Sequence, residues 1–209
     1  MKHIITMLCL LLFAAFGMAQ ERKFISSCGK TETAIKWSEE HRNGKIRLNT
    51  VQDSDRHEYL LGNGYKTESW KIMNPSTNTD MTVCLNCGTY TLSGRFKGKP
   101  ISKTVKSKGK PWYQNIAYNA GVTLKNVKTV EYECFRPDNM KLYTMCATKK
   151  GIEKFDGKNA LRIEVGLTGF LSVFWSCDYY FDADTLLFVG YKGVNGGPGT
   201  PETKISVSR

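Results

Sequence analysis

The chain of 209 residues has few of the residue types on which catalytic and metal sites usually depend. It contains three histidines and seven cysteines. That number of cysteines is too small for a dense disulfide scaffold at this length. Cys84 and Cys87 form a C-x-x-C motif, but no second such motif and no spaced histidine pair completes a zinc site. No G-x-S-x-G motif occurs, so there is no recognisable nucleophile elbow. We therefore expect neither enzymatic activity nor a cofactor.

Long apolar runs are missing after residue 16. A short basic start precedes an apolar run over residues 4–16, and the small residue Ala19 follows it. This pattern is typical of a secretory signal, and the run is shorter than the roughly 20 residues of a spanning helix. We expect residues 1–20 to be a cleaved signal peptide. Residues 21–209 then form a single exported domain that is soluble, either periplasmic or secreted.

Acidic residues are absent from Met81 to Val130, a stretch that holds nine lysines and arginines. The net charge of the whole chain is +11, and the segments on either side are close to neutral. In an exported protein nucleic acid is not an expected partner. The block is either a solvated, exposed loop or hairpin, or a contact for an anionic membrane surface. The residues expected at that contact are Arg95, Lys97, Lys99, Lys103, Lys106, Lys108 and Lys110.

Alternation of apolar and polar residues is the strongest local pattern. It predicts half-buried strands at 130–134 and 160–168, and a returning strand at 141–148 after the turn at 137–139. Helix evidence is thin: Thr31 to His41 fits a short helix or a strand, and 111–128 is the other candidate. The chain is therefore expected to be mainly β, a single-domain antiparallel curved sheet, half-barrel or barrel with at most one or two short helices. Further strands are expected at 46–52, 66–73, 81–87, 89–96, 170–175, 179–182, 186–192 and 204–208.

Six cysteines follow the signal and allow 15 pairings, among which the sequence does not choose. Cys84 and Cys87 lie in a strand–turn–strand context, which favours a hairpin-turn disulfide or plain thiols over metal or redox chemistry. A two-residue turn at 138–139 sets Cys134 opposite Tyr143 and places Cys134 and Cys146 on opposite faces, whereas a three-residue turn places them on one face.

Asp53, Asp55 and His57 recur at every second position. On an extended segment they share a face and could bind a metal. The favoured interpretation is a solvated loop, because no calcium-loop pattern with its central glycine follows.

Aromatic residues are dense between positions 170 and 181. One interpretation is ordinary β-core packing. The other is an apolar concave face that takes an acyl chain. The residues expected on that face are Trp112, Tyr132, Phe170, Phe174, Trp175 and Tyr180.

In the last third of the chain, expected strands alternate with turns. They run from Glu153 to Val165, then from Phe174-Trp175 to the YYFD segment at 179–182, and end with the closing strand at 204–207. This pattern resembles the periplasmic lipoprotein-carrier-like (LolA/LolB-like) β half-barrels and related uncharacterised envelope proteins. The resemblance implies a curved sheet with an apolar concave face and supplies no catalytic residue.

Together these features predict an exported bacterial envelope protein that binds a lipid or other amphipathic ligand. The first alternative is an adhesion or complex-forming module that uses the 81–130 block. The second is a metal-dependent hydrolase built on His57, Asp53 and Asp55.

Overall fold

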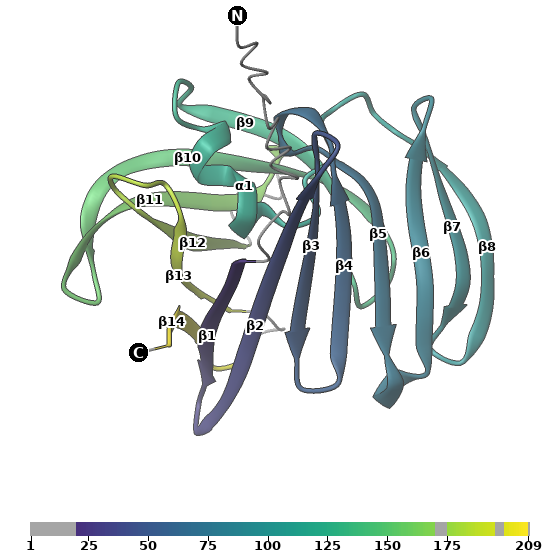
Figure 1. Cartoon of the computed structure of the whole chain (residues 1–209), viewed down its shortest axis with the longest axis horizontal. Coiled ribbons are helices and arrows are strands. Elements are labelled where there is room, and N and C mark those ends of the chain that lie inside the picture. Colours follow the sequence, from purple (N-terminus) through teal and green to yellow (C-terminus); the bar gives the residue numbers. More distant parts are fainter. Residues whose placement is uncertain (1–19, 170–174, 195–198, 209) are drawn as a thin grey trace, which may run out of the picture.

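The computed structural model describes residues 20–169, 175–194 and 199–208. Within these ranges, fourteen strands form one antiparallel sheet (Figure 1). Its order is β8-β7-β6-β5-β4-β3-β2-β1-β14-β13-β12-β11-β10-β9. The strands are β1 Gln20–Cys28, β2 Thr31–Arg42, β3 Lys45–Gln52, β4 Asp55–Leu61, β5 Thr67–Asn74, β6 Thr79–Asn86, β7 Thr89–Phe96, β8 Lys99–Lys106, β9 Thr129–Phe135, β10 Leu142–Phe155, β11 Lys158–Leu167, β12 Ser176–Asp182, β13 Phe188–Gly193 and β14 Thr203–Val207.

The sheet is strongly curved, so that β9 to β12 cross behind the front strands (Figure 1). One α-helix, α1 (Ile116–Thr123), connects the two halves of the chain, and its residues Ile116, Ala117 and Ala120 belong to the core. Two single-turn 3₁₀ helices, Asn63–Tyr65 and Pro75–Thr77, lie in connections between strands. The predicted fold class, a mainly β antiparallel curved sheet with little helix, is confirmed.

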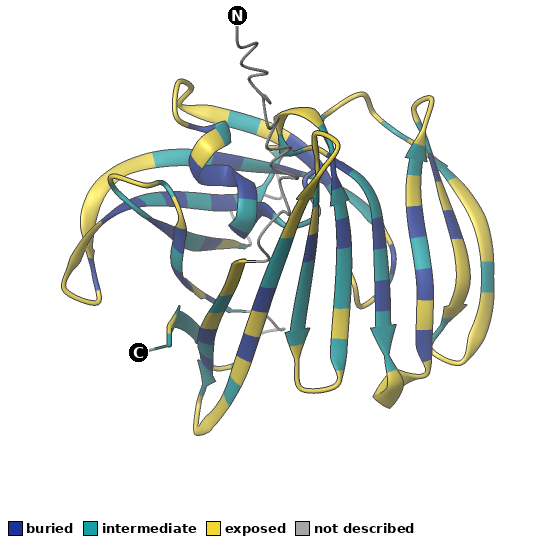
Figure 2. Ribbon diagram, viewed as in Figure 1, coloured by how far each residue is buried: buried dark blue, intermediate teal, exposed yellow. Residues whose placement is uncertain are grey.

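The core lies on the concave side because the side-chain period of a strand is two. On β6, Met81 and Val83 are buried, while their neighbours are partly or fully exposed. Tyr90 and Leu92 repeat the pattern on β7, and the alternating dark blue and yellow bands of Figure 2 show it along β6 and β7. Burial of this apolar surface holds the curve of the sheet.

The two ends of the sheet overlap instead of pairing edge to edge. Phe135 of β9 packs on Tyr90 of β7 with ring centroids 5.0 Å apart, and Trp112 lies 5.1 Å from the same tyrosine ring. Both contacts are edge-to-face, the preferred geometry of aromatic pairs. The three rings therefore join the last strand in the sheet order to the second.

The connection between β8 and α1, residues 107–115, covers the edge of β9 and is called the strap below. The Glu133 amide donates to the Pro111 carbonyl at 2.8 Å, and the Tyr113 amide donates to the Glu133 carbonyl at 3.1 Å. The Gln114 side chain bonds both the amide and the carbonyl of Phe135. Backbone groups that an edge strand would leave unpaired are satisfied in this way.

A buried carboxylate fixes the strap. The Glu133 oxygens accept from the Tyr90 hydroxyl at 2.6 Å, the Ser107 hydroxyl at 3.0 Å and the Lys108 amide at 2.6 Å. The Lys110 amide approaches at 3.3 Å. Burying a carboxylate is costly unless such donors surround it, because the charge loses its water. The donors come from β7 and from the strap, so the side chain links three parts of the chain.

Several elements differ from the sequence predictions. The segment 31–42 is strand β2, which resolves the helix-or-strand alternative. The predicted strands omit β1, β4 and β8, and the helix is shorter than 111–128. The segment 55–61 forms a strand because Tyr59 and Leu61 are buried in the core beside β5. The charged residues at its start hide the apolar alternation in the sequence. Of the predicted strand 170–175, only Trp175 lies within the described residues, and it precedes β12.

We expect Glu133→Ala to lower the free energy of unfolding by about 3 kcal/mol, because it leaves the buried donors of Tyr90 and Lys108 without an acceptor. Urea denaturation followed by tryptophan fluorescence measures the change. Glu131→Ala on the same strand is the matched control: its ion pair with Lys110, 2.8 Å long, is exposed to water and contributes little to stability. Equal losses in the two variants would contradict the role given to Glu133.

Candidate ligand-binding cavity

A cavity of about 490 Å³ lies on the concave side of β9, β10 and β11, between these strands, the strap and the start of α1. It is called the large cavity below. Its size is within the 300–1,000 Å³ range of small-molecule pockets. Its lining comprises Tyr113, Gln114, Ile116, Tyr132, Cys134, Phe135, Arg136, Pro137, Tyr143, Met145, Val165, Leu167, Trp175 and Tyr179.

Strand register places the lining residues side by side. Met145 on β10 lies opposite Tyr132 on β9 and opposite Leu167 on β11. Facing residues of neighbouring strands point to the same side of a sheet. One row of three apolar side chains therefore forms a wall of the cavity.

Two smaller cavities adjoin the large one. The middle cavity, about 280 Å³, shares Gln114, Ile116 and Tyr179 with it. The small cavity, about 160 Å³, shares Trp37, Ala117 and Tyr179 with the middle one. Tyr179 lines all three, so this ring and the first turn of α1 separate spaces that follow one another along the concave face.

The interior of the large cavity is uncharged. Burial raises the pKa of the Cys134 thiol to about 12 and the pKa of the Tyr132 and Tyr179 hydroxyls well above 10. The Gln114 amide is committed to the backbone of Phe135. The charged lining residue is Arg136, whose exposed guanidinium lies 5.9 Å from the Tyr143 ring centroid and pairs with the Asp138 carboxylate at 2.7 Å. The arrangement suits an apolar group inside and a polar or anionic group outside.

Of the six residues predicted for the apolar face, two line the large cavity, two lie outside the described residues and two lie elsewhere in the fold. Tyr132 and Trp175 line the large cavity, and the Trp175 indole donates to the Val194 carbonyl at 2.9 Å. Phe170 and Phe174 lie outside the described residues.

Trp112 and Tyr180, which the sequence predicts on the apolar face, do not line the large cavity. Trp112 fills the aromatic contact between Tyr90 and Phe135. Tyr180 stacks on Phe155, ring centroids 4.3 Å apart, in a small cluster separate from the main core. Its neighbour Tyr179 takes the cavity position because consecutive strand residues face opposite sides.

Tyr143, Met145 and Tyr179 are lining residues that the sequence reasoning missed. A signal for one wall was available, since the alternation at 160–168 already put Val165 and Leu167 on one side. Nothing local showed which of two adjacent tyrosines faces inward.

All the residues predicted for an anionic contact (Arg95, Lys97, Lys99, Lys103, Lys106, Lys108 and Lys110) are exposed and lie on the β7–β8 hairpin and the strap. Lys97 donates to the Asp138 carbonyl at 2.6 Å and Lys103 to the Met140 carbonyl at 3.3 Å. These bonds tie the hairpin to the 136–140 turn, which borders the mouth of the large cavity. In the described sheet β8 pairs only with β7, and lysines on such an edge also discourage pairing with other chains.

The six described cysteines are free. Cys134 faces Tyr143 and Cys146 faces Glu131, which confirms the register predicted for a two-residue turn. Cys84 and Cys87 are exposed at the β6–β7 hairpin, in the strand–turn–strand context expected for them.

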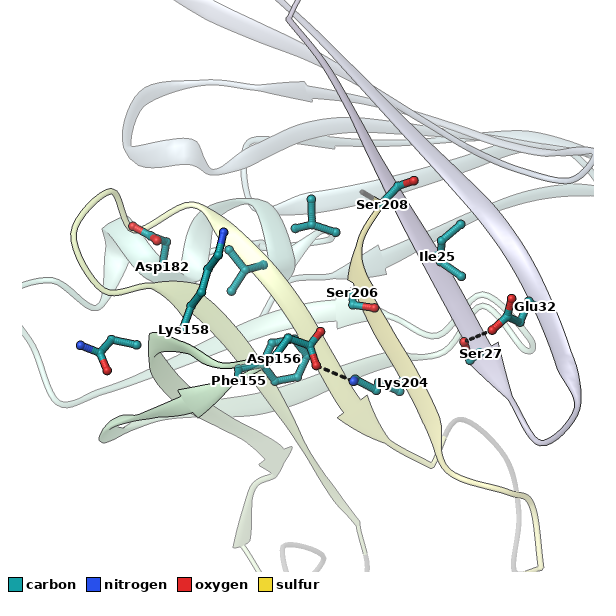
Figure 3. Close-up of a pocket in the computed structure, with 13 residues that line it drawn as sticks. Ile25, Ser27, Glu32, Phe155, Asp156, Lys158, Asp182, Lys204, Ser206 and Ser208 are labelled. Atoms are coloured by element: carbon teal, nitrogen blue, oxygen red, sulfur yellow. Dashed lines mark hydrogen bonds and ion pairs between the residues drawn. The ribbon is translucent and has the colours of Figure 1, made fainter.

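A groove of about 660 Å³ lies on the other side of the sheet, across β1, β14 and the β10–β11 turn (Figure 3). Lys204 and Asp156 pair across it at 2.5 Å, and Ser27 bonds Glu32 at 3.3 Å. Three of its charged side chains thus already have partners within the groove, and we place no ligand site there.

Asp53, Asp55 and His57 do not converge on one point. Asp53 is exposed in the β3–β4 turn with a positive φ of 52°, whereas Asp55 and His57 line the middle cavity. Over the described residues, no group of three histidine, cysteine or acidic side chains has the arrangement of a metal site. The His57 ring instead accepts a hydrogen bond at Nδ1 from the Trp70 indole at 3.1 Å.

Burial lowers the pKa of His57 to about 4, below its ordinary value of 6.5. As the pH falls, His57 therefore takes up a proton in the unfolded chain at a higher pH than in the folded protein. The stabilisation that comes from keeping His57 neutral is fully present above pH 6.5 and is lost as the pH falls towards 4. The wild-type free energy of unfolding should therefore fall between pH 7 and 4, and about 3 kcal/mol of this fall should come from His57. We expect His57→Asn, which keeps an acceptor for Trp70, to remove that part of the fall.

Urea denaturation at a series of pH values measures this difference. His41→Asn, at an exposed position on β2, is the control and should keep the wild-type pH profile. A His57→Asn profile parallel to that of the wild type would contradict the prediction.

No helix in the described ranges has the length and apolar character needed to cross a membrane. No model of a known protein family matches the chain, and no curated protein matches it.

Solved structures do match. A β-barrel-like protein of domain of unknown function DUF1849 from Brucella abortus aligns with 91% of this chain and 96% of its own, at 7% identity and a TM-score of 0.63. The MucA/MucB complex of Pseudomonas aeruginosa aligns with 91% of this chain and 50% of its own (10% identity, TM-score 0.38). A DUF1329 family protein from Desulfovibrio piger aligns with 93% and 85% (10% identity, TM-score 0.29). The chain thus has the fold of the Brucella β-barrel-like protein.

Proposed function

We propose that the protein binds a lipid or other amphipathic ligand, with the apolar part of the ligand in the large cavity. The observation that carries the proposal is the cavity of about 490 Å³ lined by Tyr132, Met145, Leu167 and Tyr179. A packed β-core ordinarily leaves few voids larger than a water molecule. An apolar space of this size, open at one side, is what an acyl chain requires.

The charge distribution supports an amphipathic ligand over a purely apolar one. The inner lining is neutral, whereas Arg136, paired with Asp138, stands at the mouth, and Lys97 and Lys103 contact the turn beside it. A polar or anionic head group would meet these cations while its chain lies inside.

We propose that the protein acts by binding, without catalysis, in the periplasm or after secretion. The apolar start of the sequence supports export. Each of the best-placed titratable groups already has a structural partner: His57 accepts from Trp70, and Glu133 holds the strap.

A complex-forming module is the second candidate, and the free edge of β8 favours it. An extended acidic segment could add to this edge as a further strand, with Lys99, Lys103 and Lys106 opposite its carboxylates.

We expect native mass spectrometry to detect a 1:1 adduct of the wild-type protein with palmitate. Leu167→Trp, which fills the large cavity from β11, should weaken this binding at least about tenfold. Val207→Trp is the control, because Val207 is 48% exposed on β14 and does not line the cavity. No adduct with the wild type, or equal binding by both variants, would overturn the proposal.

A further inference from the structure

Exposed apolar side chains gather at one place on the molecule. Among the described residues, five large apolar side chains are exposed, and four of them are Val122, Val127, Ile152 and Leu187, with exposed fractions of 42–58%. They are called the rim patch below. The exposed parts of α1, of β10 and of the β12–β13 turn, yellow in Figure 2, lie on one side of the view.

Two of the four residues line one surface hollow, and the other two are chain neighbours of residues that meet beside it. Val127 and Ile152 line one surface hollow of about 740 Å³, which Leu186 also borders, next to Leu187. The α1 backbone at Gly121, next to Val122, packs so closely on the Leu186 carbonyl that an added Cβ would lie 2.4 Å from its oxygen. Residues from α1, the loop before β9, β10 and the β12–β13 turn thus meet.

The patch is an exposed continuation of the core. Ile152 lies opposite Leu161 in the β10–β11 ladder, and Leu161 is buried in the main core. The ladder shifts register between Lys149 and Gly151, where glycine takes a φ of +136°. Beyond this bulge β10 continues past the cover of α1, so that Ile152 is 58% exposed.

Lysines surround the apolar residues. Lys125, Lys128, Lys149 and Lys150 line the same hollow, together with one acid, Asp184. The Lys149 ammonium donates to the Lys125 carbonyl at 3.1 Å, and Lys150 pairs with Glu164 at 2.8 Å. The charge of the hollow is therefore positive.

We propose that the rim patch docks on an anionic lipid bilayer. Apolar side chains ringed by lysines are the arrangement that binds the interface of anionic membranes, where the apolar groups enter the acyl boundary and the lysines contact head groups. A second copy of this chain fits poorly, because a symmetric contact would bring four lysines against four lysines. This inference does not depend on the ligand proposed for the large cavity.

The patch differs from the lysine-rich β7–β8 hairpin in one respect. Within the described chain, none of the large exposed apolar side chains lies on that hairpin. A membrane contact there would be electrostatic alone, whereas the rim patch adds apolar insertion.

Sedimentation of the full-length mature protein with phosphatidylcholine vesicles, with and without phosphatidylglycerol, tests the proposal. Each lysine near an anionic surface is worth about 1 kcal/mol, so Lys125→Gln/Lys128→Gln should weaken binding to the anionic vesicles about 30-fold. Lys99→Gln/Lys106→Gln makes the same change of charge on β8 and should weaken it less than about threefold. Val127→Asn/Ile152→Asn should also reduce binding, and these exposed positions leave the fold intact.

Loss of binding confined to the patch variants supports the proposal. Three results overturn it: no binding of the wild type to anionic vesicles, equal weakening by the two lysine pairs, or unchanged binding of Val127→Asn/Ile152→Asn. Sedimentation velocity without vesicles tests the other possible partner. Wild-type dimers that become monomers in the patch variants would assign the surface to a second copy of the chain and overturn the proposal.

Discussion

The carboxylate of Glu133 is the interaction on which the closure of the molecule depends. A sheet of fourteen strands that ends in β8 and β9 has two edges, and in this protein they do not pair with each other. The carboxylate gathers donors from β7 and the strap, while three aromatic rings fill the space beside it. The rolled sheet is therefore closed by side chains and a connecting segment instead of by a ladder.

This kind of closure leaves room inside. In a small closed barrel the interior is filled by side chains from all the strands. Here one face of β9 packs against the strap, while its other face, with Tyr132 and Cys134, borders the large cavity. α1 fills only part of the concave side, and the remaining space forms three cavities around Tyr179. The candidate site is thus a product of the overlap.

Much of the fold could be predicted because strand alternation is a local property. The ladder between β9 and β10 has the register of the two-residue turn, one of the two alternatives that the sequence left open, with Cys134 opposite Tyr143. The site was only partly predictable. Tyr132 and Trp175 line the cavity, but which side of β12 faces inward depends on β11 and β13, and the lining residue is Tyr179, whereas the sequence predicts Tyr180. Glu133 could not be recognised either, because a glutamate in an alternating strand normally indicates the solvent side, and the strap that buries it comes from a distant segment.

The order of the strands has a consequence for how the chain can fold. β1 pairs with β14, Phe24 opposite Val207, so the first and last strands of the described chain meet in the middle of the sheet, while the edge strands β8 and β9 come from the middle of the sequence. During synthesis β1 is made well before its partner β14. One side of β1 therefore stays unpaired until β14 has been made, and an open strand is a template for pairing with other molecules.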